Sequence, residues 1–340
     1  MRAYSAKGGE NIETRKILVT GAGGYVGSRL VAKLVKNGFK VVAVDTYWYG
    51  RDVFGFEPNS NLQIVELDIR ELSGLRNAMA GVTDVIHLAC ISNDPSFDLN
   101  PRLGKSINLD AFEPLVLIAR ENGIRRFIYA SSSSVYGVKG EERVTEDLSL
   151  KPLTDYSKYK AICEEILMRY VASDFVCTIL RPATVCGWSP RQRLDLSVNI
   201  LTNHALNKGI ITVFGGSQFR PNIHIEDMVD AYLVTLNAPE IKVNGQIFNV
   251  GADNLSMNDI AAEVSKNTGV SEVVYEPTND LRSYRIDSTK IIEELGFIFK
   301  RNVGMAVSDL ATAFKSNRFV DPLNNPLYYN IKRMKELEVH

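Results

Sequence analysis

The stretch that decides the fold is KILVTGAGGYVG, residues 16–27. Its first five residues predict a short buried strand, and a helical pattern over residues 25–37 follows the glycines. Gly21 permits a tight turn, Gly24 lets backbone approach a ligand closely, and Gly27 lets the helix pack against the strand. A strand, a glycine turn and a helix in this order form the context that a dinucleotide fingerprint requires.

The spacing of these glycines is GxxGxxG. It differs from the GxGxxG of long-chain dehydrogenases, because Val26 stands where that pattern has its last glycine. Taken alone, the motif also fits an ordinary glycine-rich turn between a strand and a helix.

Short apolar runs alternate with helical patterns on the carboxyl side of this stretch. Such alternation is typical of βαβ units and a parallel sheet. We therefore expect an α/β fold, a doubly wound parallel sheet (Rossmann) with a smaller C-terminal substrate-binding lobe. The predicted strands are 16–20, 40–45, 62–67, 84–88, 126–130, 176–180 and 246–250, and the predicted helices include 25–37, 107–121 and 155–171.

The alternation ends after residue 181, where prolines and Gly215-Gly216 interrupt mixed segments. This change predicts the smaller lobe, and the polar proline-containing end predicts an appended arm. The expected division is a flexible leader at 1–14, a Rossmann domain at 15–182 plus 222–250, a substrate-binding lobe at 183–221 plus 251–320, and a C-terminal arm at 321–340.

Composition excludes several classes of partner. The chain has 340 residues and a formal net charge of −1, so it has no basic excess to recruit nucleic acid or anionic lipid. Its four cysteines lack the paired spacings of a zinc site and are too few for a disulfide framework. No apolar run is long enough to span a bilayer. We expect a cytoplasmic protein with no metal, nucleic acid or membrane partner.

The second strand ends at Asp45, about twenty residues after the glycine turn, where a carboxylate can accept hydrogen bonds from adenosine ribose hydroxyls. This position favours NAD, because the Asp45 carboxylate would repel the 2′-phosphate of NADP. Nearby Arg51 could bind that phosphate, so NADP stays an alternative. Asp68 and Ile69 end the third strand and are expected to flank the adenine. A polar strand end followed by a core residue is an equal alternative for this pair.

Tyr156 and Lys160 are four residues apart on a predicted helix, and therefore on one face. An adjacent ammonium favours the phenolate and lowers a tyrosine pKa, so that Tyr156 can act as a base on an alcohol. Ser131 to Ser134 follow the fifth strand and can present a hydroxyl to the same oxygen. A solvated helix face and a hydroxyl-rich turn are the alternatives for each motif alone.

With these motifs in this order, the sequence resembles the extended short-chain dehydrogenase/reductases that act on nucleotide sugars, which include UDP-galactose 4-epimerase and dTDP-glucose 4,6-dehydratase. The likeness runs from about Lys16 to Phe299 and also includes HLA at 87–89, Asn108, SSSSVYG at 131–137, LRP at 180–182 and RPNIHIED at 220–227.

The resemblance implies the roles of individual residues. Counted back from Val135-Tyr136-Gly137, the catalytic hydroxyl is Ser132, which acts with Tyr156 and Lys160. The implied NAD-binding residues are Gly21, Gly24, Tyr25, Val26, Gly27, Asp45, Asp68, Ile69, Leu88, Ala89, Asn108, Tyr156, Lys160 and Pro182. The implied substrate-binding residues are Asn93, Ser133, Arg220 and Arg282, with Arg220 on the nucleotide diphosphate and Arg285 as an alternative to Arg282. Asn93 fits a loop-capping role equally well.

The function implied is NAD-dependent oxidation and reduction at C4 of a sugar carried on a nucleotide diphosphate. A nucleotide-sugar 4-epimerase is the first reading, and a 4-ketoreductase or 4-dehydrogenase is the second. A non-catalytic NAD-binding scaffold or redox sensor is the alternative of another class. The resemblance also implies a homodimer that pairs helices 107–121 and 155–171, through Leu109, Phe112, Leu115, Ile162 and Ile166.

Several further residues limit the chemistry. The related 4,6-dehydratases follow their catalytic hydroxyl with an Asp-Glu pair, whereas this chain has Ser133 and Ser134, so we expect no elimination of water. Glu141, Glu142 or Cys186 would have to replace that pair. His87 and His224 lie between apolar neighbours and are expected to be packed core groups, and Cys186 a small hydrophobe.

Overall fold

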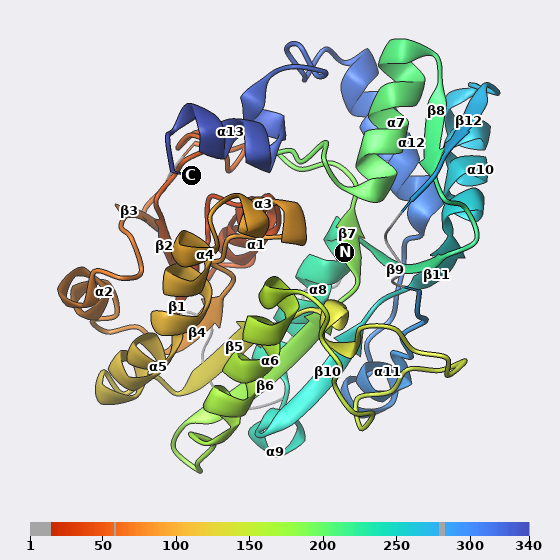
Figure 1. Ribbon diagram of the computed structural model, residues 1–340. Coiled ribbons are helices and arrows are strands. Elements are labelled where there is room, and N and C mark those ends of the chain that lie inside the picture. The colour runs from red at the N-terminus through yellow and green to blue at the C-terminus, as the bar shows by residue number, and fades with distance from the viewer. Residues whose placement is uncertain (1–14, 58, 279–282, 340) are drawn as a thin grey trace.

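The computed structural model describes residues 15–57, 59–278 and 283–339. Its largest element is a seven-stranded sheet in which every pairing is parallel (Figure 1). The strand order is β10-β6-β5-β4-β1-β2-β3, so the chain starts near the middle and winds outward to both sides. This is the doubly wound arrangement expected from the sequence. The strands are β1 (Lys16–Thr20), β2 (Lys40–Asp45), β3 (Leu62–Glu66), β4 (Asp84–His87), β5 (Arg126–Ala130), β6 (Val176–Pro182) and β10 (Gln246–Val250).

Helices cover both faces of this sheet, which is why its strands are nearly continuous apolar runs. Two hydrophobic clusters, one on each face, make up the core. One cluster includes α1 (Tyr25–Lys36), α8 (Ile225–Asn237), α9 (Glu240–Val243) and α11 (Thr289–Leu295), and the other includes α2 (Leu72–Ala78), α5 (Phe112–Glu121) and α6 (Asp155–Met168).

The helix expected at 107–121 is in two parts. A π-helical turn (Ser106–Asp110) precedes α5, which begins at Phe112. Two short helices come before it, α3 (Asp94–Leu99) and α4 (Pro101–Lys105), and each begins with an asparagine cap and a proline in its first turn. These irregular segments shape the loop that follows β4.

A smaller unit is built from segments that lie between and after the strands of the large sheet. Its core cluster includes Cys186, Val198 and Ile260. Its β7, β9 and β11 form one sheet, and β8 pairs with β12. The expected boundaries between the two lobes remain a prediction. One of them was placed between residues 221 and 222, and strand β9 runs across this position. The elements are β7 (Thr184–Cys186), α7 (Ser197–Lys208), β8 (Ile211–Phe214), β9 (Phe219–His224), β11 (Asp253–Ser256), α10 (Met257–Thr268), β12 (Val273–Glu276) and α12 (Val303–Lys315).

The carboxyl-terminal arm returns to the large sheet. After α12 the chain crosses to the edge of the sheet near β2, where α13 (Asn330–Glu336) packs (Figure 1). Asn330 is 5% exposed and Met334 is 2% exposed, and Arg333 Nε donates to the carbonyl oxygen of Trp48 at 2.5 Å. The arm therefore contacts the first domain through buried side chains, and its expected bounds of 321–340 remain a prediction.

The apolar residues expected to form a dimer interface are mostly core. Phe112, Leu115 and Ile166 are buried within the single chain. On the same two helices, Leu117 and Ile162 are exposed at 41% and 39%. Phe112, Leu115 and Ile166 therefore carry no interface, and the dimer itself remains a prediction.

Within the described ranges, no helix combines the length and apolar character needed to cross a membrane. Among the same residues, no group of three or more histidine, cysteine, aspartate or glutamate side chains is placed so that it could hold a metal ion.

Candidate functional site

A cavity of about 400 Å³ lies at the carboxyl ends of the parallel strands. Its walls come from the segments that follow β1 to β6, together with parts of the smaller unit and α13. Chain connections leave β1 and β4 in opposite directions at this edge, which is where ligands bind in open α/β sheets. The volume lies in the range of small-molecule sites.

The glycine turn forms the floor of this cavity. Gly21 has a φ of +71°, and a Cβ at this position would lie 2.6 Å from the backbone nitrogen of Ala89. A Cβ on Gly27 would lie 2.0 Å from the Gly21 carbonyl oxygen, so glycine is required for α1 to approach the turn. Helix α1 begins at Tyr25, and its N-terminus, with its partial positive charge, borders the cavity.

Asp45 joins the glycine turn to the loop after β2. Its carboxylate accepts hydrogen bonds from the backbone nitrogens of Gly23 at 3.0 Å and Tyr47 at 2.8 Å. Burial raises the pKa of Asp45, although these hydrogen bonds oppose the rise. Asp68 and Ile69 also line the cavity, and a hydrogen bond from Arg70 is the main cause of the lowered Asp68 pKa.

Tyr156 and Lys160 both face the cavity from the start of α6. The helix begins there because Thr154 caps it in a reciprocal capping box with Ser157. Lys160 is buried, and its Nζ donates to the Ala130 carbonyl oxygen at 2.6 Å. The same Nζ lies 5.9 Å from the centre of the Tyr156 ring.

The electrostatic surroundings of Tyr156 differ from the sequence-based expectation. Burial raises its pKa well above the ordinary value, and the charges of Cys90 and Asp94 raise it further. Arg193 and a hydrogen bond with Ser132 act in the opposite direction. In the chain by itself, desolvation therefore outweighs the groups that lower this pKa, and the expected action of Lys160 on Tyr156 remains a prediction.

The four adjacent serines have four different environments. Ser131 Oγ donates to Glu164, Ser133 Oγ lies 3.1 Å from the hydroxyl of Tyr284, and Ser134 Oγ donates to Ser132 Oγ at 2.8 Å. Ser132 lines the cavity together with Tyr156 and is the serine that lowers the pKa of this tyrosine. Of the four serines, Ser132 is thus the candidate partner of the tyrosine.

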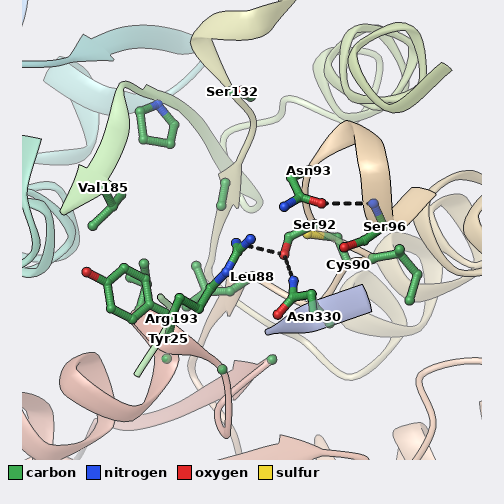
Figure 2. A pocket seen from close by; sticks show the side chains of 18 of the residues that line it. Tyr25, Leu88, Cys90, Ser92, Asn93, Ser96, Ser132, Val185, Arg193 and Asn330 are labelled. Carbon is green, nitrogen blue, oxygen red and sulfur yellow. Dashed lines mark hydrogen bonds between the residues drawn. The ribbon is translucent and has the colours of Figure 1, made fainter. Parts of the chain in front are cut away.

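Two of the expected ligand contacts have structural roles. Asn93 caps α3 by accepting from the Ser96 nitrogen at 3.0 Å, although it also lines the cavity (Figure 2). Asn108 is not among the residues that line the cavity, and its expected place beside NAD remains a prediction. Its amide holds Ile91 in the loop after β4 through two hydrogen bonds, of 2.8 Å and 3.0 Å.

The remaining expected residues lie as follows. Arg220 lines the cavity from β9. Arg282 lies outside the described residues, and the guanidinium of its alternative, Arg285, stacks 3.5 Å from the centre of the Phe219 ring. The other expected residues that line the cavity are Gly21, Gly24, Tyr25, Val26, Gly27, Asp45, Asp68, Ile69, Leu88, Ala89, Ser132, Ser133, Tyr156, Lys160 and Pro182.

Sequence reasoning missed part of the cavity wall. It did not identify Tyr49, Ser92, Arg191, Arg193 or Asn330, all of which line the cavity. Figure 2 shows the guanidinium of Arg193 pointing toward Ser92, and Asn330 reaching the same serine from α13. The available signal was the PRQRLD segment, residues 190–195, in which two arginines follow a proline in an otherwise apolar region.

The histidine and cysteine expectations are confirmed by burial. His87 is 4% exposed with Nδ1 2.7 Å from Thr20 Oγ1, and His224 is 1% exposed and caps α8. Cys186 is buried in the core of the smaller unit, and burial raises the pKa of its thiol. None of the three side chains lines the cavity.

The comparisons with known proteins agree on one family. The model of the NAD dependent epimerase/dehydratase family matches residues 17–251. A UDP-glucose 4-epimerase of Mycolicibacterium smegmatis is 32% identical over 297 residues, which cover 83% of this chain and 93% of that protein. A UDP-N-acetyl-alpha-D-glucosaminuronate decarboxylase of Bacillus cytotoxicus is 29% identical and covers 77% of this chain and 84% of its own length. The solved structure of a UDP-glucuronic acid 4-epimerase from Bacillus cereus, in complex with UDP-glucuronic acid and NAD, is similar with a TM-score of 0.79 and 26% identity, over 89% of this chain and 99% of that one.

Proposed function

Because this chain belongs to the NAD-dependent epimerase/dehydratase family and is an NAD-dependent enzyme, we propose that it is a nucleotide-sugar 4-epimerase that oxidises and re-reduces C4 of its substrate. The observation that carries the proposal is that Ser132, Tyr156 and Lys160 line one cavity, with the Lys160 Nζ 5.9 Å from the centre of the Tyr156 ring. The alternative of a non-catalytic scaffold is set aside because the family consists of enzymes.

The residues present fit the cofactor. A side chain at Gly21 or Gly27 would clash with backbone, so the turn keeps the N-terminus of α1 open to a diphosphate. Asp45 stands where ribose hydroxyls would bind, and Asp68 and Ile69 form the wall for the adenine. When bound, NAD supplies the hydride acceptor for oxidation of the sugar carbon and the donor for its reduction.

The chain's own groups handle the proton. In our proposal the Tyr156 phenol oxygen takes the proton of the C4 hydroxyl, and the Ser132 hydroxyl holds the same sugar oxygen. Lys160 is fixed by the Ala130 carbonyl, so its charge stays near the phenol as that group ionises. If the 4-keto sugar turns over within the cavity, Tyr156 would return its proton to the C4 oxygen while hydride adds to the other face of C4, and the product is the epimer. Loss of the 4-keto compound would instead make the enzyme a 4-dehydrogenase or, in reverse, a 4-ketoreductase.

The substrate is proposed to be a UDP-sugar. The epimerases from M. smegmatis and B. cereus are named for UDP-glucose and UDP-glucuronic acid, and both are similar to this chain over most of its length. Arg220 on β9 offers a guanidinium to the nucleotide diphosphate from the wall of the smaller unit.

The groups for elimination of water are missing from the cavity wall. Ser133 and Ser134 replace the acidic pair of the dehydratases, and the exposed Glu141 and Glu142 do not line the cavity. Cys186 is buried elsewhere. Among the described lining residues the carboxylates are Asp45, Asp68 and Asp94, and Asp94 accepts a hydrogen bond from Thr154 at 2.5 Å. We therefore propose redox chemistry at C4 without dehydration.

We further propose that the protein is a cytoplasmic homodimer. Its four cysteines are free, as in a reducing compartment. Leu117 and Ile162 are the exposed apolar residues on α5 and α6 that a pairing of these helices would cover. Sedimentation as a monomer at micromolar concentration would contradict the dimer.

The decisive experiment is incubation of the purified protein with UDP-, dTDP-, GDP- and CDP-sugars in deuterated water. We expect a C4 epimer of one UDP-sugar, without net change in the redox state of NAD, without loss of water and without deuterium at C5. Tyr156→Phe should lower kcat by about 10²–10⁴-fold. Tyr159→Phe is the matched control, because this tyrosine lies on the same helix but does not line the cavity.

Three outcomes would overturn parts of the proposal. Equal turnover by Tyr156→Phe would remove the tyrosine from the mechanism. Accumulation of a 4-keto sugar with NADH would replace epimerisation by dehydrogenation. Deuterium at C5 together with loss of water would show that the chain performs elimination with groups other than Ser133 and Ser134.

A further inference from the structure

A pair of buried arginines lines the same cavity as the glycine turn. Arg191 and Arg193 are 4% and 7% exposed, and both line the cavity from the segment between β7 and α7. Neither was identified from the sequence, and neither has a role in the proton chemistry proposed above. Two cationic side chains removed from water in one segment need an explanation, because burying charge is costly unless it is compensated.

Compensation by the protein is incomplete. Arg191 Nη2 donates to Asn330 Oδ1 at 2.7 Å, and its guanidinium lies 3.5 Å from the centre of the Tyr49 ring. Within the described part of the chain, Nε and Nη1 of Arg191 are buried without a hydrogen-bond partner. A buried donor that lacks a partner carries its full desolvation cost, so an acceptor at this place would be bound strongly.

Arg193 is held in a similar way. Its Nε donates to Asp195 Oδ1 at 2.9 Å and its Nη1 to Ser92 Oγ at 3.2 Å, whereas Nη2 has no partner among the described residues. The segment therefore carries two guanidinium charges and one carboxylate, and three buried N–H-bearing nitrogens remain unused. A planar guanidinium with free donors is suited to phosphate oxygens.

The position of the arginines indicates which phosphate they face. Their segment contacts Tyr25, the first residue of α1, because Ser189 Oγ donates to the Tyr25 carbonyl oxygen at 2.8 Å. Asn199 Nδ2 donates both to the Tyr25 hydroxyl at 3.1 Å and to the Arg193 carbonyl oxygen at 2.8 Å. In agreement, the charges of both arginines oppose the rise in the Tyr25 pKa that burial produces. Arg220 lines the cavity from a different strand, β9.

We propose that Arg191 and Arg193 form a cationic wall that binds the diphosphate of the dinucleotide opposite the N-terminus of α1, and that Asn330 of the arm is the positioning residue of this wall. The diphosphate would then lie between two sources of positive charge, the helix terminus on one side and the guanidinium groups on the other. NAD held in this way is retained between rounds of the reaction, which suits an enzyme that returns the hydride to its own substrate.

Asn330 suits the positioning role because it links three separate segments. Its Oδ1 accepts from Arg191 and, at 3.0 Å, from the hydroxyl of Tyr49. Its Nδ2 donates to Ser92 Oγ at 3.0 Å, and its backbone nitrogen donates to Asp195 Oδ2 at 3.0 Å. Loss of this amide would release Arg191 from the wall while leaving both positive charges in the chain.

The test is the affinity of the cofactor-stripped full-length protein for NAD, measured by calorimetry for Arg191→Met, Arg193→Met and Asn330→Ala. We expect the Kd for NAD to rise at least tenfold in each arginine variant, which corresponds to about 1.4 kcal/mol. Asn330→Ala should raise the Kd by a smaller factor, and the double variant Arg191→Met/Asn330→Ala should bind no more weakly than Arg191→Met. Arg318→Met is the matched control, because this exposed arginine stacks on Trp188 and does not line the cavity.

A second titration separates the two diphosphates that the cavity could receive. Binding of UDP to the NAD-loaded parent and variants should differ by less than twofold. Weakened UDP binding with unchanged NAD binding would overturn the proposal and assign the arginines to the substrate. Unchanged NAD binding in folded variants would overturn it as well. If a methionine variant fails to fold, Arg191→Lys and Arg193→Lys replace it. The proposal would also be contradicted if both lysine variants bound NAD with the affinity and the salt dependence of the parent. Neither titration needs turnover, so the result is independent of the epimerase proposal.

Discussion

His87 makes the stability of this protein depend on pH in a way that can be worked out from its surroundings. The imidazole is 4% exposed and packs between the rings of Phe112 and Tyr129, with centroids 5.4 Å and 5.8 Å away. Burial, and then the positive charge of Lys160, lower the pKa of His87 from 6.5 to about 3. In the unfolded chain the pKa has its ordinary value.

Between these two values the unfolded chain binds a proton that the folded chain does not. The free energy of unfolding therefore falls as the pH is lowered from 6.5 toward 3, and the loss is absent above 6.5. At about 1.4 kcal/mol per pKa unit, His87 removes about 2 kcal/mol by pH 5 and about 5 kcal/mol by pH 3. The loss is large against a total stability of about 5–15 kcal/mol.

The assay is urea unfolding at pH 7.5 and pH 5.0 for the parent, His87→Asn and the control His204→Asn. We expect His87→Asn to be less stable than the parent at pH 7.5, because ring packing is lost, yet to lose about 2 kcal/mol less on acidification. His204 is partly exposed on α7, and burial and Lys208 lower its pKa without the large shift of His87, so its variant should lose only slightly less stability than the parent on acidification. An equal loss between the two pH values in the parent and in His87→Asn would refute the reasoning, as would an imidazole pKa near 6.5 measured by NMR on the folded protein.

Two further predictions concern buried carboxylates. Glu164 and Arg181 form a buried ion pair with an Nη2–Oε2 distance of 2.6 Å, so Glu164→Gln should lower the free energy of unfolding by about 3–5 kcal/mol, measured by urea unfolding at pH 7.5. A loss under about 1 kcal/mol would mean that the pair is compensated by other contacts. Asp45→Ala should weaken binding of NAD much more than that of NADP, because the carboxylate is placed to accept from ribose hydroxyls and to repel a 2′-phosphate. Equal Kd ratios for NAD and NADP in the parent and the variant would remove Asp45 from the cofactor site.

The predictable parts of the fold are those in which the pattern of residue types over neighbouring positions indicates a strand, a turn or a helix. Strand β1, the glycine turn and α1 are adjacent in the chain, and their residue types report directly on backbone geometry. The spacing of Tyr156 and Lys160 was informative for the same reason, because four residues on a helix make one face. The choice of Ser132 among four serines came from the resemblance, and the geometry of the structure agrees with it.

The parts that were not predictable depend on contacts between distant segments. The hydrogen bond from Arg191 to Asn330 joins residues 139 apart, and that from Asn330 to Ser92 joins residues 238 apart. An asparagine in a polar tail has the composition of a solvated residue, and only its partners elsewhere in the chain make its burial favourable. Asn108 illustrates the same limit, since a polar residue in an apolar helix fits a ligand contact and a loop support equally well, and the structure adds its two hydrogen bonds to Ile91.

The pKa of Tyr156 could not be predicted for a related reason. The sequence shows the lysine four residues away but not the extent to which both side chains are removed from water. Desolvation is a property of the whole cavity, to which Cys90 from the loop after β4 and Arg193 from the segment after β7 also contribute. A charge argument made from one helix therefore left out the largest contribution to the Tyr156 pKa, which is burial.

The return of the arm to the large sheet sets an order of events when the protein is made. The hydrogen bond from Arg333 to Trp48 joins residues 285 apart, whereas β1 and β2 pair across a short connection. Contacts that close such long loops form late, and domains generally fold from the amino terminus during synthesis. The glycine turn can therefore be folded while the far wall of the cavity has not yet been synthesised. A newly made chain passes through a stage at which a dinucleotide can enter from that side without any opening motion, and docking of the arm then ends this stage.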